Sequence, residues 1–153
     1  MKTVVPAHQL EDYVGKELGH SEWFTIDQQR INQFADVTVD HQFIHVDEEK
    51  AAEGPFGATV AHGFLTLSLL THLTQDCGLV PENVVMGVNY GCDKLRFIQP
   101  VRVNQRVRAR VTPMSVIERA PGQYLIKSEI TVEIDGEDKP ALVAQWLALL
   151  FTG

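Results

Sequence analysis

The sequence predicts an α+β domain in which a curved antiparallel sheet wraps around one buried central helix. Apolar residues surround the segment 62–76 on nearly every side, which is typical of a buried helix. After Pro81 the chain changes to alternating runs of β-branched and aromatic residues, the only elements able to cover that helix. With 153 residues, 44% of them hydrophobic, residues 1–153 are expected to form a single domain with one core.

Short helices are expected before the central helix. Thr25 and Gln28 have the spacing of a capping box, with Thr25 as the N-cap of an amphipathic helix that ends near Asp36. A second helix of one to two turns is expected over 47–54, where Asp47 can cap the first turn. Both helices lie in the half of the chain that precedes the strands.

Strands are expected after the central helix, over residues 84–97, 101–117 and 124–134. In the second of these, Arg106, Arg108 and Arg110 share one face and small apolar residues share the other. Asp135-Gly136 is typical of a hairpin turn. The last run, 141–151, is ambiguous, because its alanine and leucine content favours a helix whereas its length and position favour a buried strand.

Charge and cysteine usage exclude several classes of protein. The net charge of −7 opposes binding to nucleic acid, which depends on neutralising phosphates. Cys77 and Cys92 form no paired motif and are expected to be reduced thiols. The N-terminus lacks the pattern of a signal peptide, and the longest apolar run is too short and interrupted to span a membrane. A soluble cytoplasmic protein is therefore expected.

Candidate catalytic groups lie in two separate segments. Asp40 and His45 are five residues apart, so they converge only if that segment is irregular or extended, and the bulky residues around them disfavour a helix there. Gly63, at the start of the central helix, can offer a free backbone N–H. Together these groups can hold a water, move its proton and polarise a carbonyl. The alternatives are solvated side chains at 40 and 45 and a glycine that serves only close packing.

A metal site is a weaker interpretation of the same segment. His41 and His45 are four residues apart, and Asp40, Asp47 and Glu48 are close in sequence. Both imidazoles would have to lie on one face of a helix, and no distant third ligand is evident. No metal is therefore expected.

Three segments in order, 34–36, 40–45 and 57–63, resemble the signature of MaoC-like (R)-specific enoyl-CoA hydratases. The resemblance extends from about residue 19 to residue 151, includes the strand 89–97, and points to the single-hotdog, nodulation protein N-like subgroup. Two separated motifs with the right order and spacing are much more specific than either alone. The acid and the imidazole of the family pattern match Asp40 and His45.

The chain departs from the family pattern at three positions that shape the loop. The family has glycine before the aspartate and asparagine and proline after it, where this chain has Val39, Gln42 and Phe43. A serine that the family often places on the central helix matches Thr71, which keeps a hydroxyl. Ser68, one turn earlier, is a weaker candidate for that role.

The resemblance implies a hotdog fold and a homodimer with the active site between the subunits, and it favours a strand for 141–151. It also implies reversible addition of water to a trans-2-enoyl thioester, giving a (3R)-3-hydroxyacyl product, with Asp40 and His45 handling water and the Gly63 N–H stabilising the enolate-like oxygen. No cofactor is implied, because coenzyme A is part of the acyl-CoA substrate. The sequence does not indicate which of the two side chains is the base.

Substrate contacts are less specific. Apolar walls for the acyl chain can come from Phe43, Phe56 and Phe64, although simple core packing explains them equally well. Lys94 and Arg96 on one strand, and the three arginines on the next, can bind phosphates of coenzyme A or can be a solvated sheet face.

Rival functions remain open at this point. They are a dehydratase acting on thioesters of an acyl carrier protein, a non-catalytic acyl-thioester-binding subunit, and a thioesterase, since one fold hosts several reactions. The intact Asp40 and His45 argue against a purely binding role, whereas the altered loop at 42–43 keeps it open.

Overall fold

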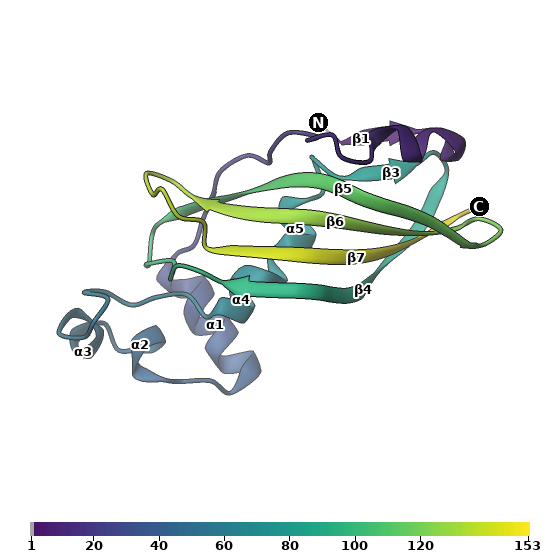
Figure 1. Ribbon diagram of the computed structural model, residues 1–153. Helices are drawn as coiled ribbons and strands as arrows, with labels where there is room; N and C mark the ends of the chain where they lie inside the picture. The colour runs from purple at the N-terminus through teal and green to yellow at the C-terminus, as the bar shows by residue number, and fades with distance from the viewer. Residues whose placement is uncertain (1) are drawn as a thin grey trace.

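A computed structural model describes residues 2–153 and places an antiparallel sheet against a helical segment (Figure 1). The predicted arrangement of sheet and central helix is confirmed. The five strands run in the order β2-β5-β6-β7-β4. Their bounds are Phe24–Thr25 for β2, Val84–Phe97 for β4, Arg106–Ala120 for β5, Gln123–Ile134 for β6 and Leu142–Thr152 for β7.

The helical segment behind the sheet consists of two short helices, α4 (Gly63–Ser68) and α5 (Leu70–Leu73). The prediction of one continuous helix over 62–76 is therefore wrong in detail. The Ser68 hydroxyl donates to the carbonyl of Phe64, 2.7 Å away, and such a bond to the preceding turn bends helices. The backbone nevertheless stays in the right-handed helical region at Leu69.

Burial of this segment is one-sided. Leu65, Leu70 and Leu73 are buried in the main core, together with inward residues of β5, β6 and β7. Phe64, in contrast, is 65% exposed, and Ser68 and Thr71 are also exposed. The expectation of a helix buried on every side is thus wrong for the face that points away from the sheet core.

The strands follow the expected alternation, and the largest boundary shift is at the start of β5. On β5 the apolar residues Val107, Ala109 and Val111 are buried, and the arginines between them lie on the other face. β5 begins at Arg106 rather than at 101, because Asn104 adopts a left-handed φ of 67° in a turn. The ambiguous last run forms β7, which pairs with both β4 and β6, as the resemblance implies.

The N-terminal segment packs beside the far end of the sheet. β1 (Thr3–Val5) pairs in parallel with β3 (Leu79–Pro81), and a 3-10 helix, η1, spans Ala7–Tyr13. The two cysteines are not disulfide-bonded. Within residues 2–153 no helix has both the length and the apolar character needed to cross a membrane.

Three further helices lie at the other end of the sheet, near the candidate site (Figure 1). They are α1 (Gln28–Thr38), α2 (Phe43–Val46) and α3 (Glu48–Ala52). Thr25 is not the N-cap of α1, because it pairs with Arg106 in the sheet; Asp27 caps the helix by accepting from the N–H of Arg30 at 2.8 Å. Asp47 caps α3 as predicted. The helix α2 was not expected.

Candidate active site

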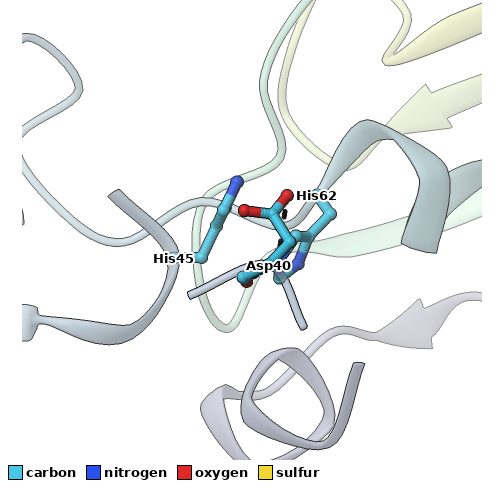
Figure 2. Close-up of side chains that lie close together, drawn as sticks. All are labelled: Asp40, His45 and His62. Carbon is cyan, nitrogen blue, oxygen red and sulfur yellow. Dashed lines mark hydrogen bonds and ion pairs between the residues drawn. The ribbon is translucent and has the colours of Figure 1, made fainter. Parts of the chain in front are cut away.

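Three side chains from separate segments meet at one end of the sheet (Figure 2). Asp40 comes from the loop after α1, His45 from α2, and His62 from the residue that precedes α4. One donor or acceptor atom of each lies within 4.8 Å of the others. The predicted convergence of an acid and an imidazole is therefore present, and a second imidazole joins them.

The end of α1 directs Asp40 into this group. Val39 caps the helix in the left-handed conformation, with φ of 59°, and the N–H groups of Val39 and Asp40 both donate to the carbonyl of Ala35. A β-branched residue costs on the order of 1–2 kcal/mol in this conformation. Glycine is free of that cost, which explains why a glycine fits this position in the family pattern.

A one-turn helix, α2, positions His45. Gln42 occupies its N-cap without a side-chain hydrogen bond, and Phe43 follows at the first helical position. Asparagine is well suited to the N-cap and proline to the first helical position, so Gln42 and Phe43 favour the start of this helix less than the residues of the family pattern would. Tertiary hydrogen bonds hold α2 instead. Gln28 Nε2 donates to the carbonyl of His45 at 2.7 Å, and its Oε1 accepts from the buried hydroxyl of Thr59.

The hydrogen bond of the His45 ring fixes its tautomer. Nδ1 lies 2.6 Å from the carbonyl oxygen of Val60, so Nδ1 carries the proton and donates. In the neutral ring Nε2 therefore carries a lone pair. Burial lowers the pKa of His45 below its ordinary value of 6.5; charge on His62 acts in the same direction, and the bond to Val60 and the charge on Asp40 oppose it.

His62 was assigned no role from the sequence. Its ring stacks on that of His45, with centroids 3.7 Å apart and planes at 22°, and its Nε2 lies 3.0 Å from the carbonyl oxygen of Asp40. Its only sequence signal is its position, directly before Gly63 in the segment that carries the resemblance. A contact between two imidazoles 17 residues apart leaves no periodic pattern.

Gly63 and His45 line one cavity of about 320 Å³. The other lining residues are mostly apolar and include Phe56, Phe97 and Val101. Gly63 is the first residue of α4, and the side chain of the N-cap His62 makes no capping bond to the first turn. A Cβ added at Gly63 would lie 3.1 Å from the Phe97 ring, so a side chain here would crowd the space beside the N–H.

The three phenylalanines that were candidates for contacting the acyl chain lie in different places. Phe56 lines the cavity, whereas the half-buried Phe43 lies under Lys50, whose Nζ is 4.6 Å from the ring centroid. Phe64 is exposed and packs edge-on against Phe97. Ser68 and Thr71 do not line the cavity; they lie on the exposed face of α4 and α5, where Thr71 accepts from Asn89 at 3.3 Å.

The two sets of basic residues differ in their partners. Arg106 pairs with Asp135, Arg108 pairs with Glu133, and Arg110 lies within 3.7 Å of carboxylates of Glu17 and Glu133. These contacts favour the solvated, ion-paired sheet face over a phosphate site. Lys94 and Arg96 are exposed on β4, and the part of the chain that the structure describes gives them no ion pair.

The cluster fits a metal ion poorly. His41 turns away and pairs with Asp36 at 2.8 Å, and it precedes α2 instead of sharing a helix with His45. The rings of His45 and His62 are nearly parallel, so their in-plane lone pairs do not converge on one point.

Comparison with known proteins is consistent with this geometry. Residues 9–135 match the family model described as a MaoC like domain. The chain is 50% identical to nodulation protein N of Rhizobium meliloti over 141 residues, covering 92% of this chain and 88% of that protein. It is 45% identical to 3-hydroxyacyl-thioester dehydratase Z of Mycobacterium tuberculosis over 145 residues, 95% of each chain.

Solved structures extend the comparison to the fold. A MaoC-like dehydratase from Rhodospirillum rubrum superposes with a TM-score of 0.74 at 22% identity, covering 94% of this chain and 97% of that one. At that identity the likeness concerns the fold alone. The α+β architecture of this chain, a curled antiparallel sheet packed on a helical segment, is the hotdog fold.

Proposed function

The chain belongs to the MaoC-like dehydratase domain family, and we propose that it catalyses the reversible hydration of trans-2-enoyl-CoA thioesters. The product is the (3R)-3-hydroxyacyl thioester. The observation that carries the proposal is a neutral, buried His45 with a free Nε2 lone pair beside the Asp40 carboxylate. The name of the M. tuberculosis relative supports a thioester as the substrate class.

The tautomer of His45 supports one order of proton transfers in the proposed reaction. The only proton of the neutral ring is on Nδ1 and is engaged with Val60, so the ring can accept a proton at Nε2 before it can donate one. His45 removes a proton from the water as the water oxygen bonds to C3 of the substrate. It then returns that proton to C2 on the same face. Asp40, whose side chain is 53% exposed, orients the water by accepting its other hydrogen.

Gly63 serves the other end of the reacting group. As oxygen adds to C3, the electrons of the double bond move toward the thioester carbonyl, whose oxygen becomes enolate-like. The Gly63 N–H, in the same cavity as His45, donates to that oxygen. Removing one such donor costs about 10²–10³ in rate. The scheme needs no metal or cofactor beyond the coenzyme A of the substrate.

Substrate binding follows from the same cavity. Its apolar wall, to which Phe56 and Phe97 contribute, receives the carbons next to the double bond. Lys94 and Arg96, which lie on β4 with Phe97, attract the phosphates of coenzyme A. Phe43, Ser68 and Thr71 lie outside this cavity, and Ser68 and Thr71 line a separate one.

A homodimer accounts for the exposed side of β4. Within residues 2–153, β4 is an edge strand that pairs only with β7, and apolar side chains on it are exposed. An uncovered, 14-residue edge strand with apolar side chains is a typical pairing surface. The exposed apolar residues of β4 are Val85, Met86, Val88, Tyr90 and Phe97, and Phe64 packs against Phe97.

The direct test follows the absorbance of the enoyl-thioester band with crotonyl-CoA, in the wild type, Asp40→Asn and His45→Ala. We expect the band to disappear without release of free thiol, and both substitutions to slow turnover by roughly 10²–10⁴. Circular dichroism and thermal melts check that the variants fold.

Other outcomes distinguish the rival functions. Release of free thiol indicates a thioesterase. Turnover of octenoyl or carrier-protein thioesters, with no change on crotonyl-CoA, indicates a longer or protein-borne acyl chain. A thermal shift on adding ligand, with no conversion of any thioester, contradicts the proposal and indicates a binding module.

A further inference from the structure

One buried side chain, His62, contacts both His45 and Asp40, the two residues that bind the reacting water in the proposed hydration. Its side chain is 3% exposed. It stacks on the His45 ring at 3.7 Å and lies 3.0 Å from the Asp40 carbonyl oxygen. We propose that His62 is a positioning residue, which holds Asp40 through its Nε2–H and shields one face of the His45 ring from water. This inference rests on the proposed function.

The hydrogen bond to Asp40 restricts a residue that has few other restraints. The Asp40 side chain is half exposed, and its carboxylate has two long contacts: it accepts from the N–H of Gln42 at 3.4 Å and lies 3.9 Å from His62 Nε2. Two hydrogen bonds hold the Asp40 backbone: its N–H donates to the carbonyl of Ala35, and its carbonyl accepts from His62. Without His62, one of these two hydrogen bonds is lost and the carboxylate is free to drift from His45.

The same hydrogen bond determines which ring nitrogen of His62 carries a proton. A carbonyl oxygen can only accept, so Nε2 carries a proton and the other nitrogen of a neutral ring, Nδ1, carries a lone pair. Nδ1 is buried and has no hydrogen-bond partner within residues 2–153. A proton added there would be a buried donor without an acceptor. His62 therefore acts as a hydrogen-bond donor to Asp40 and not as a second base.

The stacked ring also controls the surroundings of His45. The cavity that His45 faces contains no other titratable side chain, and the charged or titratable groups that act on His45 are Asp40 and His62. With the ring of His62 stacked on one face and apolar walls on the cavity side, bulk solvent has little access to the faces of the His45 ring, while Nε2 stays free to bind the reacting water. Burial is the main cause that lowers its pKa, and a smaller residue at 62 would weaken it.

Two substitutions separate the two roles. His62→Phe keeps an aromatic ring over His45 but removes the donor to Asp40. His62→Gln keeps an N–H that can reach the Asp40 carbonyl but removes the ring. His8→Gln, at an exposed histidine, is the matched control. Each is measured by the pH dependence of kcat/KM and by an NMR titration of the His45 ring, assigned by comparison with His45→Ala.

We expect His62→Phe to lower kcat by roughly 10- to 100-fold through misplacement of Asp40, with the His45 titration near its wild-type midpoint. In His62→Gln the midpoint should rise toward 6.5, and the acidic limb of kcat/KM should rise with it. The proposal is overturned if both variants fold and leave kcat and the midpoint unchanged. A lower Tm alone, with kcat and the midpoint kept, would mean that His62 only packs.

The NMR titration uses no substrate, so it separates this inference from the proposed function. If no thioester is converted by the wild type but the His45 midpoint rises in His62→Gln only, the hydratase proposal fails and the shielding role stands. If thioesters are converted and the midpoint stays at its wild-type value in both variants, the shielding role fails and the hydratase stands.

Discussion

Two regions of this chain depart from the usual partition of polar and apolar groups, in opposite directions. At the start of α4, two imidazoles are buried and lie against each other and against apolar residues. Along β4, apolar side chains such as Met86 and Tyr90 are 50% exposed. The first region hides groups that water would solvate well, and the second exposes groups that water solvates poorly.

The difference is consistent with the two roles proposed for these regions. Buried titratable groups are costly unless hydrogen bonds hold them, and here each ring is held by a backbone carbonyl. That cost is typical of a site where chemistry requires an unusual protonation state. An exposed apolar edge strand is typical of a surface that another chain covers. The two exceptions therefore point to a reaction at one place and a subunit contact at the other.

The largest expected effect comes from making β4 polar. Met86→Asp combined with Val88→Asp places two like charges on the face that a second copy would cover, so the dimer should dissociate at micromolar concentration. Sedimentation or light scattering measures the mass. Val37→Asp, at an exposed valine on α1, is the control and should stay dimeric. A doubly charged variant that keeps the dimer mass would show that β4 is not the contact.

A smaller effect is expected at the link between α1 and α2. Gln28→Ala removes the hydrogen bond to the His45 carbonyl and leaves the buried Thr59 hydroxyl unpaired. The free energy of unfolding should fall by about 1–3 kcal/mol and turnover should fall with it. Urea denaturation measures the first and the crotonyl-CoA assay the second. Gln33→Ala, exposed on the same helix, should change neither.

The burial of His45 also predicts a pH effect on stability. In the unfolded chain this ring titrates near 6.5, and in the folded protein its pKa is lower. Between these two values the unfolded state binds more protons, so stability falls as pH drops below 6.5 and levels off below the folded pKa. Urea melts at pH 7.5, 6.5 and 5.5 measure it. His45→Ala should lose less stability over this range than the wild type, and an equal loss would rule out His45 as the source.

The smallest effects are expected from the basic residues, and they sharpen the picture of β4. Replacing Lys94 and Arg96 by Ala should raise KM for an acyl-CoA a few-fold, more at low salt than at high salt. Replacing Arg106 and Arg108 should leave KM unchanged and cost at most about 1 kcal/mol of stability per pair. Equal KM changes in the two double variants would argue that neither pair contacts the phosphates specifically.

Much of the fold could be predicted from local patterns. Alternation along the chain identified β5 and β6, because one face of each strand is buried. The helix α2 could not be predicted in this way. Phe43 and Ile44 disfavour a helix locally, and the turn is held by contacts from Gln28 and Val60, which lie 15 to 17 residues from His45. Such contacts have no signature in a sequence window.

The candidate site was predictable in chemistry but not in arrangement. Residue type made Asp40, His45 and Gly63 candidates, and the resemblance of their segments to the family signature, rather than spacing alone, selected them. The stacking of His62 on His45 depends on how α2 packs against the start of α4, so no sequence pattern revealed it. Likewise, the arginines of β5 were recognisable as one face of a strand. Their carboxylate partners on and just after β6 became evident only with the register of the sheet.

The backbone conformation of Val39 affects how many destabilising substitutions this protein can tolerate. Its left-handed backbone beside Asp40 is kept by a valine where glycine would adopt it without strain. Val39→Gly would recover roughly 1 kcal/mol without altering any side chain that faces the cavity. A more stable starting protein tolerates more destabilising substitutions before it unfolds. Substituting this position would therefore allow more destabilising substitutions in the cavity walls, for example to fit other acyl chains, before the protein unfolds.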